Sequence, residues 1–215
     1  MAFLSRLKLN TQAAAVQRDL RNCNKLHRTV MSGFAQLDAE IGVRQALGVL
    51  FSVRPEEASL IVQSRAEPDW QLLPVNYLTE PAQVQSICSV ADAAPGTTWQ
   101  FSMLAQPSRN QARYHPDGKP RHAVRVMLTE PAEQQDWLQR QLERNGASLL
   151  EVSISRPTRH SIEGRDGRKR RRHFKAMNFE GRLRVTDPEL LTAAIEEGFG
   201  PGKSYGLGLL LLEAK

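Results

Sequence analysis

Cysteine, long apolar runs and metal-binding spacings are all scarce in this 215-residue chain, and each scarcity argues against a class of protein. Two cysteines, Cys23 and Cys88, are too few for a disulfide framework, so we expect a reducing, cytoplasmic location. Arg6 and Lys8 interrupt the apolar N-terminal segment, and every other uncharged apolar run is short. We therefore expect neither a signal peptide nor a membrane span. None of the five histidines falls in a metal-binding pattern such as H-E-x-x-H, so we expect neither a metal nor a cofactor.

Positive charge is present, and it is concentrated in one place. Residues 156–184 hold 11 Lys/Arg against three Asp/Glu, whereas the rest of the chain holds the remaining 18 Lys/Arg and 20 Asp/Glu. The centre of this region, residues 165–175, is called the basic segment below, and most of its Lys/Arg residues are arginine. Arginine suits phosphate and guanine edges, so a basic block on a near-neutral body indicates a polyanion site. A solvated loop without a ligand is the alternative reading.

The triplet Gly202-Lys-Ser204 ends the nucleotide-binding pattern G-x-x-x-x-G-K-[ST], but Glu197 occupies the position of its first glycine. A P-loop also follows a strand and opens a helix. Here the glycines follow a helical pattern that Asp187 caps, and they precede an apolar run at 207–212 that predicts a final strand. We therefore expect no nucleotide cofactor, and an ATP titration with magnesium tests the NTPase alternative.

The second half of the chain predicts the order β-α-β-β-α-β of a ferredoxin-like unit. The helices are expected from a cap at Thr129 to Gly146 and from Pro188 onward. A polar loop is expected after the first strand, and the strands are expected at 99–104, 123–128, 149–154, 175–185 and 207–212.

The first half gives a fainter pattern of the same kind. Its clearest helix covers residues 25–41, where apolar side chains recur at helical spacing. The remaining elements are strands at 3–9, 49–53 and 60–63, followed by a weak helix and strand through Val90. The sequence therefore predicts an α+β fold of two tandem ferredoxin-like domains, residues 1–92 and 98–215, joined by a linker rich in small residues, proline and glycine.

His27 is the histidine with the most suggestive position. It lies near the start of the first predicted helix, for which Asn22 or Asn24 is available as N-cap. A helix N-terminus attracts phosphate and favours neutral imidazole, which is the form that a general base requires. Lys25 and Arg28 flank it as cations that balance an anion. A surface histidine without a role is the alternative.

RNA allows a chemistry at such a histidine that needs no metal. A base removes the 2′-OH proton, the oxygen attacks the adjacent phosphorus, and a cyclic phosphate forms as the 5′-oxygen leaves. DNA lacks this hydroxyl and resists.

Several motifs together resemble the CasE endoribonucleases of type I-E CRISPR systems. The resemblance follows the chain in order over nearly its whole length, and the glycine motif near the C-terminus is its most specific part. The matching pieces are the 1–9 strand, Asn22-x-x-x-x-His27-Arg-Thr29, Glu67-Pro-Asp-Trp70, Ala105-Gln-Pro107, the helix around 137–142, Phe179-Glu-Gly-Arg-Leu183 and the glycine motif 198–208.

The resemblance implies two ferredoxin-like domains, a catalytic histidine at His27, and metal-independent cleavage of precursor CRISPR RNA at the 3′ base of the repeat hairpin. It also implies that the protein stays bound to the hairpin with other Cascade subunits. The basic segment would engage the stem, and Lys203 and Ser204 would contact phosphate. The resulting RNA-binding residues are Arg159, Arg168, Lys169, Arg170, Arg171, Arg172, Lys203 and Ser204.

Some CasE proteins have a tyrosine three residues before the catalytic histidine, where this chain has Asn24. Asparagine donates hydrogen bonds but has no phenol to exchange protons. Asn24 stays a candidate catalytic residue, and Lys25, Arg28 and Ser32 are the candidates for the missing function. The rival hypothesis is a catalytically inert protein that only anchors the RNA hairpin.

Replacement of Arg170, Arg171 and Arg172 by alanine is expected to weaken binding of the repeat hairpin and to flatten its salt dependence, because fewer phosphates are neutralised. Titration of labelled hairpin RNA at several salt concentrations measures both quantities. Unchanged affinity would remove the basic segment from the RNA site.

Overall fold

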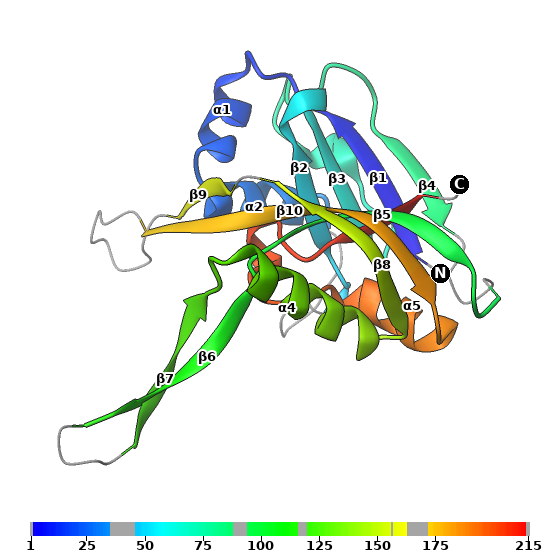
Figure 1. The fold of residues 1–215 in the computed structure, drawn as a ribbon. Helices are drawn as coiled ribbons and strands as arrows, with labels where there is room; N and C mark the ends of the chain where they lie inside the picture. The colour runs from blue at the N-terminus through cyan, green and yellow to red at the C-terminus, as the bar shows by residue number, and fades with distance from the viewer. Residues whose placement is uncertain are drawn as a thin grey trace.

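The computed structural model describes residues 2–34, 46–87, 94–115, 120–155, 157–162 and 172–213. Its strands form two four-stranded antiparallel sheets, one from each half of the chain, with a further strand and a separate hairpin attached to the second half (Figure 1). The element order is therefore that of an α+β protein, as the sequence predicts.

The N-terminal sheet has the order β2-β3-β1-β4. Its strands are β1 (Ala2–Lys8), β2 (Leu50–Arg54), β3 (Ser59–Ser64) and β4 (Gln83–Ile87). Helices α1 (Ala14–Leu20) and α2 (Cys23–Ser32) connect β1 to β2, and the short helices η1 (Pro55–Glu57) and η2 (Trp70–Leu72) lie in the turns beyond. All six residues of β3 are buried. Its apolar side chains alternate between two clusters, Leu60 and Val62 in one and Ile61 in the other.

The C-terminal sheet repeats this arrangement in the order β11-β5-β10-β8. Its strands are β5 (Thr98–Ala105), β8 (Ala147–Ile154), β10 (Arg172–Val185) and β11 (Leu210–Glu213), and β9 (Thr158–Ile162) pairs with the first part of β10. Helices α4 (Pro131–Glu143) and α5 (Pro188–Glu197) complete the β-α-β-β-α-β order, and η4 (Lys203–Tyr205) precedes β11. In each sheet the first and third strands of the unit are central, as in a ferredoxin-like fold.

The two sheets meet through a small apolar cluster and several polar contacts. Leu50 and Ile61 of the first sheet pack with Leu209, which directly precedes β11 of the second. Gln63 Nε2 donates to the buried carbonyl of Ile195 at 2.9 Å, and Arg65 pairs with Glu196 at 3.0 Å. These contacts cross between residues about 130 positions apart in sequence, so the two halves pack together as one body.

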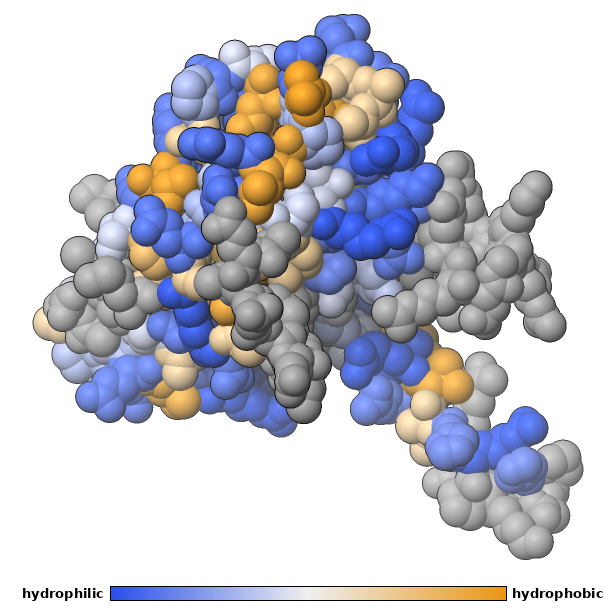
Figure 2. Space-filling model, turned by 180° about the vertical axis from the view of Figure 1, so that it is seen from behind, coloured by the Kyte–Doolittle hydropathy of each residue, from blue (hydrophilic) through white to orange (hydrophobic). Residues whose placement is uncertain are grey.

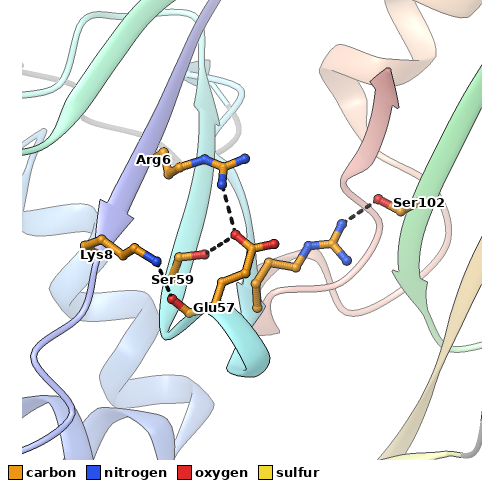
Figure 3. A network of polar contacts seen from close by, with 6 residues as sticks. Arg6, Lys8, Glu57, Ser59 and Ser102 are labelled. Carbon is orange, nitrogen blue, oxygen red and sulfur yellow. Dashed lines mark hydrogen bonds and ion pairs between the residues drawn. The ribbon is translucent and has the colours of Figure 1, made fainter. Parts of the chain in front are cut away.

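A polar network fixes the turn between β2 and β3 beside this contact (Figure 3). Arg6 Nη1 and Ser59 Oγ both donate to Glu57 Oε2, at 2.9 and 3.3 Å, and Lys8 Nζ donates to the Glu57 carbonyl at 2.8 Å. Arg54 then reaches across and donates to Ser102 Oγ of β5 at 2.5 Å. The turn is thereby tied to both sheets.

Three predicted boundaries are wrong in detail. The helix expected at 25–41 begins at Cys23 and ends at Ser32. Gly33 follows it and lies against the Trp70 ring, where a Cβ atom would stand 2.6 Å from a ring carbon. Residues 35–41 lie outside the described part. Glu130, not Thr129, is the residue before α4. The last strand begins at Leu210 rather than Leu207. The boundaries 1–92 and 98–215 of the two domains stay a prediction.

The expectation of a polar loop after β5 is also wrong, because part of that segment forms strand β6 (Ser108–Tyr114). This strand pairs with β7 (Pro120–Met127) in a two-stranded ribbon that projects from the body beyond α4 (Figure 1). Strand β6 has no alternation of apolar and polar residues, so sequence periodicity gives no signal for it. Strand β7 includes most of the strand expected at 123–128.

Candidate functional site

Helix α2 holds the imidazole of His27 against an aromatic side chain of the N-terminal sheet. Asn22 is the N-cap, and its Oδ1 accepts a hydrogen bond from the backbone N–H of Asn24 at 3.0 Å. Leu26 and other apolar residues of α2 face the sheet, and His27 lies half-buried at the margin of that face. Its imidazole stacks on the Phe51 ring of β2 with centroids 6.2 Å apart and planes 18° apart. Helix and ring together restrict the orientation of the imidazole.

Three of the other candidates on α2 lie at different places around the helix. Asn24 precedes His27 by three residues, so the two occupy neighbouring positions on one side. Lys25 precedes it by two, a spacing at which helical side chains do not face each other. Arg28 is exposed. The helix therefore brings Asn24 toward His27 and directs Lys25 elsewhere.

A buried carboxylate fixes α2 against α1, and sequence reasoning missed it. Asp19 is fully buried and accepts hydrogen bonds from Thr29 Oγ1 at 2.6 Å, Tyr77 Oη at 3.1 Å and Arg18 Nε at 2.8 Å. Burial, and then the charge of Asp19, raise the pKa of Tyr77, so its hydroxyl stays protonated and donates. Thr29 belongs to the His-Arg-Thr triplet. This triplet therefore contains both the candidate catalytic His27 and the residue that binds the helix to Asp19.

The glycine motif 198–208 places η4 beside α2. At Gly206, φ is +82°, and a Cβ atom would stand 2.9 Å from Cε2 of Phe51, the ring that supports His27. Only glycine allows the backbone to lie so close in this conformation. Lys203 and Ser204 are half-buried in η4. The motif follows helix α5 and precedes strand β11, an order opposite to that of a P-loop.

The base of the β9–β10 hairpin packs on the start of α2. Ser161 Oγ donates to the Arg21 carbonyl at 2.5 Å, and His160 Nδ1 lies 3.9 Å from Cys23 Sγ. Burial lowers the pKa of His160 and raises that of Cys23, so both groups are neutral at pH 7 and form a packing contact rather than an activated nucleophile. His160 also stacks on Phe174, with ring centroids 5.2 Å apart.

Phe174 continues this contact to the glycine motif, because its ring lies 5.7 Å from that of Tyr205 in η4. Helix α2, the base of the hairpin and the glycine motif therefore meet at one place. A cavity of about 440 Å³ opens beside them and is lined by Cys23 and Leu26 of α2, His160 of β9, and Tyr205 and Gly206 of the motif, among others.

Two of the predicted RNA-binding residues of the basic region fall within described strands. Arg159 is in β9, opposite Lys175, and Arg172 begins β10, opposite Ile162. Arg168, Lys169, Arg170 and Arg171 lie outside the described residues. Strand β9, which leads toward the basic segment, contacts α2. The roles of these arginines stay predictions.

Comparison with known proteins agrees with this arrangement of two ferredoxin-like sheets around a glycine motif. The family described as CRISPR associated protein matches residues 2–214, and the chain belongs to this family. Among curated relatives, the CRISPR-associated endoribonuclease Cse3 of Thermus thermophilus is 36% identical over 97% of this chain and 98% of its own. The Cascade subunit CasE of Escherichia coli K12 is 31% identical over 79% of this chain and 89% of its own. The resemblance to CasE proteins is thereby confirmed.

Solved structures extend the similarity to three dimensions. A CRISPR endoribonuclease Cse3 bound to a 19-nucleotide RNA matches the whole of both chains with a TM-score of 0.79 and 33% identity. Cse3 of Thermus thermophilus, bound to an RNA that represents a pre-cleavage complex, matches 99% of each chain with a TM-score of 0.77 and 32% identity. The predicted tandem ferredoxin-like fold is therefore confirmed.

Within the described ranges, no three His, Cys, Asp or Glu side chains gather as a metal site would require. None of the helices in those ranges is both long enough and apolar enough to cross a membrane.

Replacement of Gly206 by alanine is expected to lower the free energy of unfolding by about 2–4 kcal/mol, because the positive φ and the contact with Phe51 both become unfavourable. The matched control is Gly96→Ala, where φ is +93° but nothing lies within 4 Å, and about 1 kcal/mol is expected. Urea denaturation measures both variants. Equal losses would show that the close approach to Phe51 costs nothing.

The Thr29→Val variant removes one donor to the buried Asp19 without changing side-chain size, and a loss of about 1–3 kcal/mol of unfolding free energy is expected. Thr186→Val, at an exposed position, is the control. Thermal and urea unfolding that leave the two variants equally stable would contradict an anchoring role for the Asp19–Thr29 bond.

Proposed function

We propose that the chain is a metal-independent endoribonuclease that binds the hairpin of a CRISPR repeat and cleaves the precursor RNA at the 3′ base of that hairpin. His27 is its catalytic histidine. The observation that carries the proposal is the position of His27, held on Phe51 where α2, the glycine motif and the base of the β9–β10 hairpin come together.

The relatives support the substrate and the partners. The Thermus thermophilus relative is named as an endoribonuclease, and two similar Cse3 structures hold RNA, one of them as a pre-cleavage complex. The Escherichia coli relative is a Cascade subunit. We therefore propose CRISPR repeat RNA and the other Cascade subunits as partners of this chain, acting in the cytoplasm.

The chemistry follows from a single imidazole and surrounding donors. His27 takes the proton of the 2′-OH, the 2′-oxygen forms a bond to phosphorus, and the bond from phosphorus to the 5′-oxygen breaks. The products are a 2′,3′-cyclic phosphate and a 5′-hydroxyl, which gains a proton as it leaves. The base that abstracts the 2′-OH proton must approach that hydroxyl within hydrogen-bond reach. The stacked, half-buried ring of His27 is already restricted in orientation.

Cationic and polar groups around this position suit a phosphate whose charge grows during the reaction. Lys203 and Ser204 lie in η4, next to α2, and Arg28 is exposed on α2 itself. We assign these three to phosphate contact and Asn24 to a hydrogen bond near the scissile group. Lys25 precedes His27 by two residues and Arg28 follows it by one, and at neither spacing do helical side chains face each other.

The presence of asparagine at position 24, where some relatives have tyrosine, favours the rival function, an inert anchor for the RNA. Its amide lies one helical turn before His27 and donates hydrogen bonds, but it cannot deliver a proton to the leaving 5′-oxygen. An anchor of this kind would bind the hairpin as tightly as an enzyme and would leave it intact.

Cleavage of the cognate repeat RNA is expected in EDTA, and His27→Ala is expected to reduce its rate by 100-fold or more, the usual contribution of a general base being about 10²–10⁴. A substrate with 2′-deoxyribose upstream of the cut should resist the wild-type protein, because the nucleophile is missing. Gel analysis of labelled RNA measures both effects.

Two controls accompany that experiment. His27→Ala should unfold at the same temperature as the wild-type protein and should bind the hairpin with the same affinity. Tight binding without cleavage by the wild-type protein would establish the anchor instead. Cleavage that stops in EDTA and returns with added divalent metal would contradict the metal-independent mechanism.

A further inference from the structure

Three aromatic side chains form a row between strand β9 and the glycine motif, and the proposed chemistry uses none of them. His160 of β9 and Phe174 of β10 lie directly opposite each other, so they share a face of the strand pair. Their rings stack with planes 14° apart, and the Phe174 ring then meets that of Tyr205 at an interplanar angle of 39°. His160, Phe174 and Tyr205 are called the aromatic bridge below.

Both ends of the aromatic bridge lead to helix α2. At one end, His160 Nδ1 lies 3.9 Å from Cys23 Sγ, and Cys23 precedes His27 by four residues, which places the two on the same side of the helix. At the other end, Tyr205 directly precedes the glycine whose backbone lies against the Phe51 ring, and the imidazole stacks on that ring. The contacts therefore form a closed path that leaves α2 at Cys23 and returns to it at His27.

The aromatic bridge lies outside the apolar cores. None of its three residues belongs to the apolar clusters found in the described part of the chain, and all three are half-buried. The cavity of about 440 Å³ lies beside them, with His160 and Tyr205 in its lining. Side chains beside a cavity have fewer packing partners than core side chains, so we expect them to contribute less to stability and more to the relative position of the elements they join.

Phe174 also belongs to the basic segment, so it joins the aromatic bridge to the proposed RNA-binding region. His173 and Lys175 flank it on β10, their side chains point to the opposite face of the strand, and both are exposed. In Figure 2, hydrophilic side chains cover most of the visible body surface on the side where β9 lies. The strand therefore presents polar side chains on one face and the bridge on the other, and a phosphate bound at Lys175 is one residue away from the contact with the glycine motif.

We propose that the residues of the aromatic bridge, with Phe174 at its centre, are positioning residues of the cleavage reaction. They fix the position of His27 relative to RNA held on the basic segment, and they act through Cys23 at one end and Phe51 at the other. The inference rests on the proposed function. Loss of the bridge leaves the RNA bound and lowers the rate at which the bound RNA is cut, because a small misplacement of reacting groups slows a reaction strongly.

The test compares two leucine variants of the bridge, Phe174→Leu and Tyr205→Leu, with the conservative Tyr205→Phe, which keeps the ring. Trp99→Leu is the matched control, because Trp99 is a half-buried aromatic residue of β5 that packs on the C-terminal core and takes no part in the bridge. Fluorescence anisotropy measures the affinity for an uncleavable 2′-deoxy repeat RNA. Gels measure single-turnover cleavage of the normal RNA at saturating protein, and thermal unfolding measures stability.

Each leucine variant is expected to cut the bound RNA about tenfold or more slowly, with an affinity within about twofold of the wild type. Tyr205→Phe should cleave at the wild-type rate. The double variant Phe174→Leu/Tyr205→Leu should lose little more than either single variant, because both substitutions remove the same contact. Trp99→Leu should be less stable and should still cut bound RNA at the wild-type rate, which separates positioning from a general loss of stability.

Wild-type cleavage rates in both leucine variants would overturn the proposal. A loss of affinity with an unchanged rate at saturation would overturn it too, since the bridge would then be a binding site, and so would an equal loss of rate in Trp99→Leu. Should Phe174→Leu fail to fold, the comparison of Tyr205→Leu with Tyr205→Phe decides alone. A wild-type protein that leaves the RNA uncut would instead overturn the proposed function, and the role of the bridge with it.

Discussion

Phe51 is the residue on which the candidate site depends. The imidazole of His27 stacks on its ring, and the backbone of Gly206 approaches Cε2 of the same ring at a distance that no other residue permits. One buried side chain of β2 thus sets the spacing between the candidate catalytic helix and the glycine motif. The motif resembles a P-loop in three residues, yet Gly198 and Gly206 allow close packing between the two halves of the chain, against Leu50 and Phe51.

The remaining constraints hold α2 from its two ends. Asn22 caps the helix, the hairpin base contacts Arg21 and Cys23 at its start, and Asp19 holds Thr29 near its end. Buried hydrogen bonds to a carboxylate are costly to leave unmade, so these contacts favour one position of the helix. The Lys and Arg side chains differ from these buried contacts, because most of those in the described part of the chain are exposed and available to a phosphate backbone.

The sequence allowed prediction of elements with a strong local signal and missed those without one. Asp187 and the apolar spacing after it predict α5 correctly, and alternation predicts β10 through its irregular step at Arg182. Strand β6 has no apolar face and was expected to be a loop, whereas its partner β7 includes most of the strand expected at 123–128. Asp19 gave no signal because nothing local indicates that a carboxylate is buried against a threonine ten residues away. The position of His27 on a helix was predictable, whereas its contact with Phe51 depends on the sheet.

The central claim is that the scissile phosphate lies at His27. The most direct measurement is the NMR signal of the His27 imidazole, assigned by its loss in His27→Ala, during titration with an uncleavable 2′-deoxy repeat RNA. The account predicts that this signal shifts and saturates at one equivalent of RNA, together with a change in its titration with pH. An imidazole signal that stays unchanged while the hairpin is fully bound would place the RNA elsewhere and contradict the account.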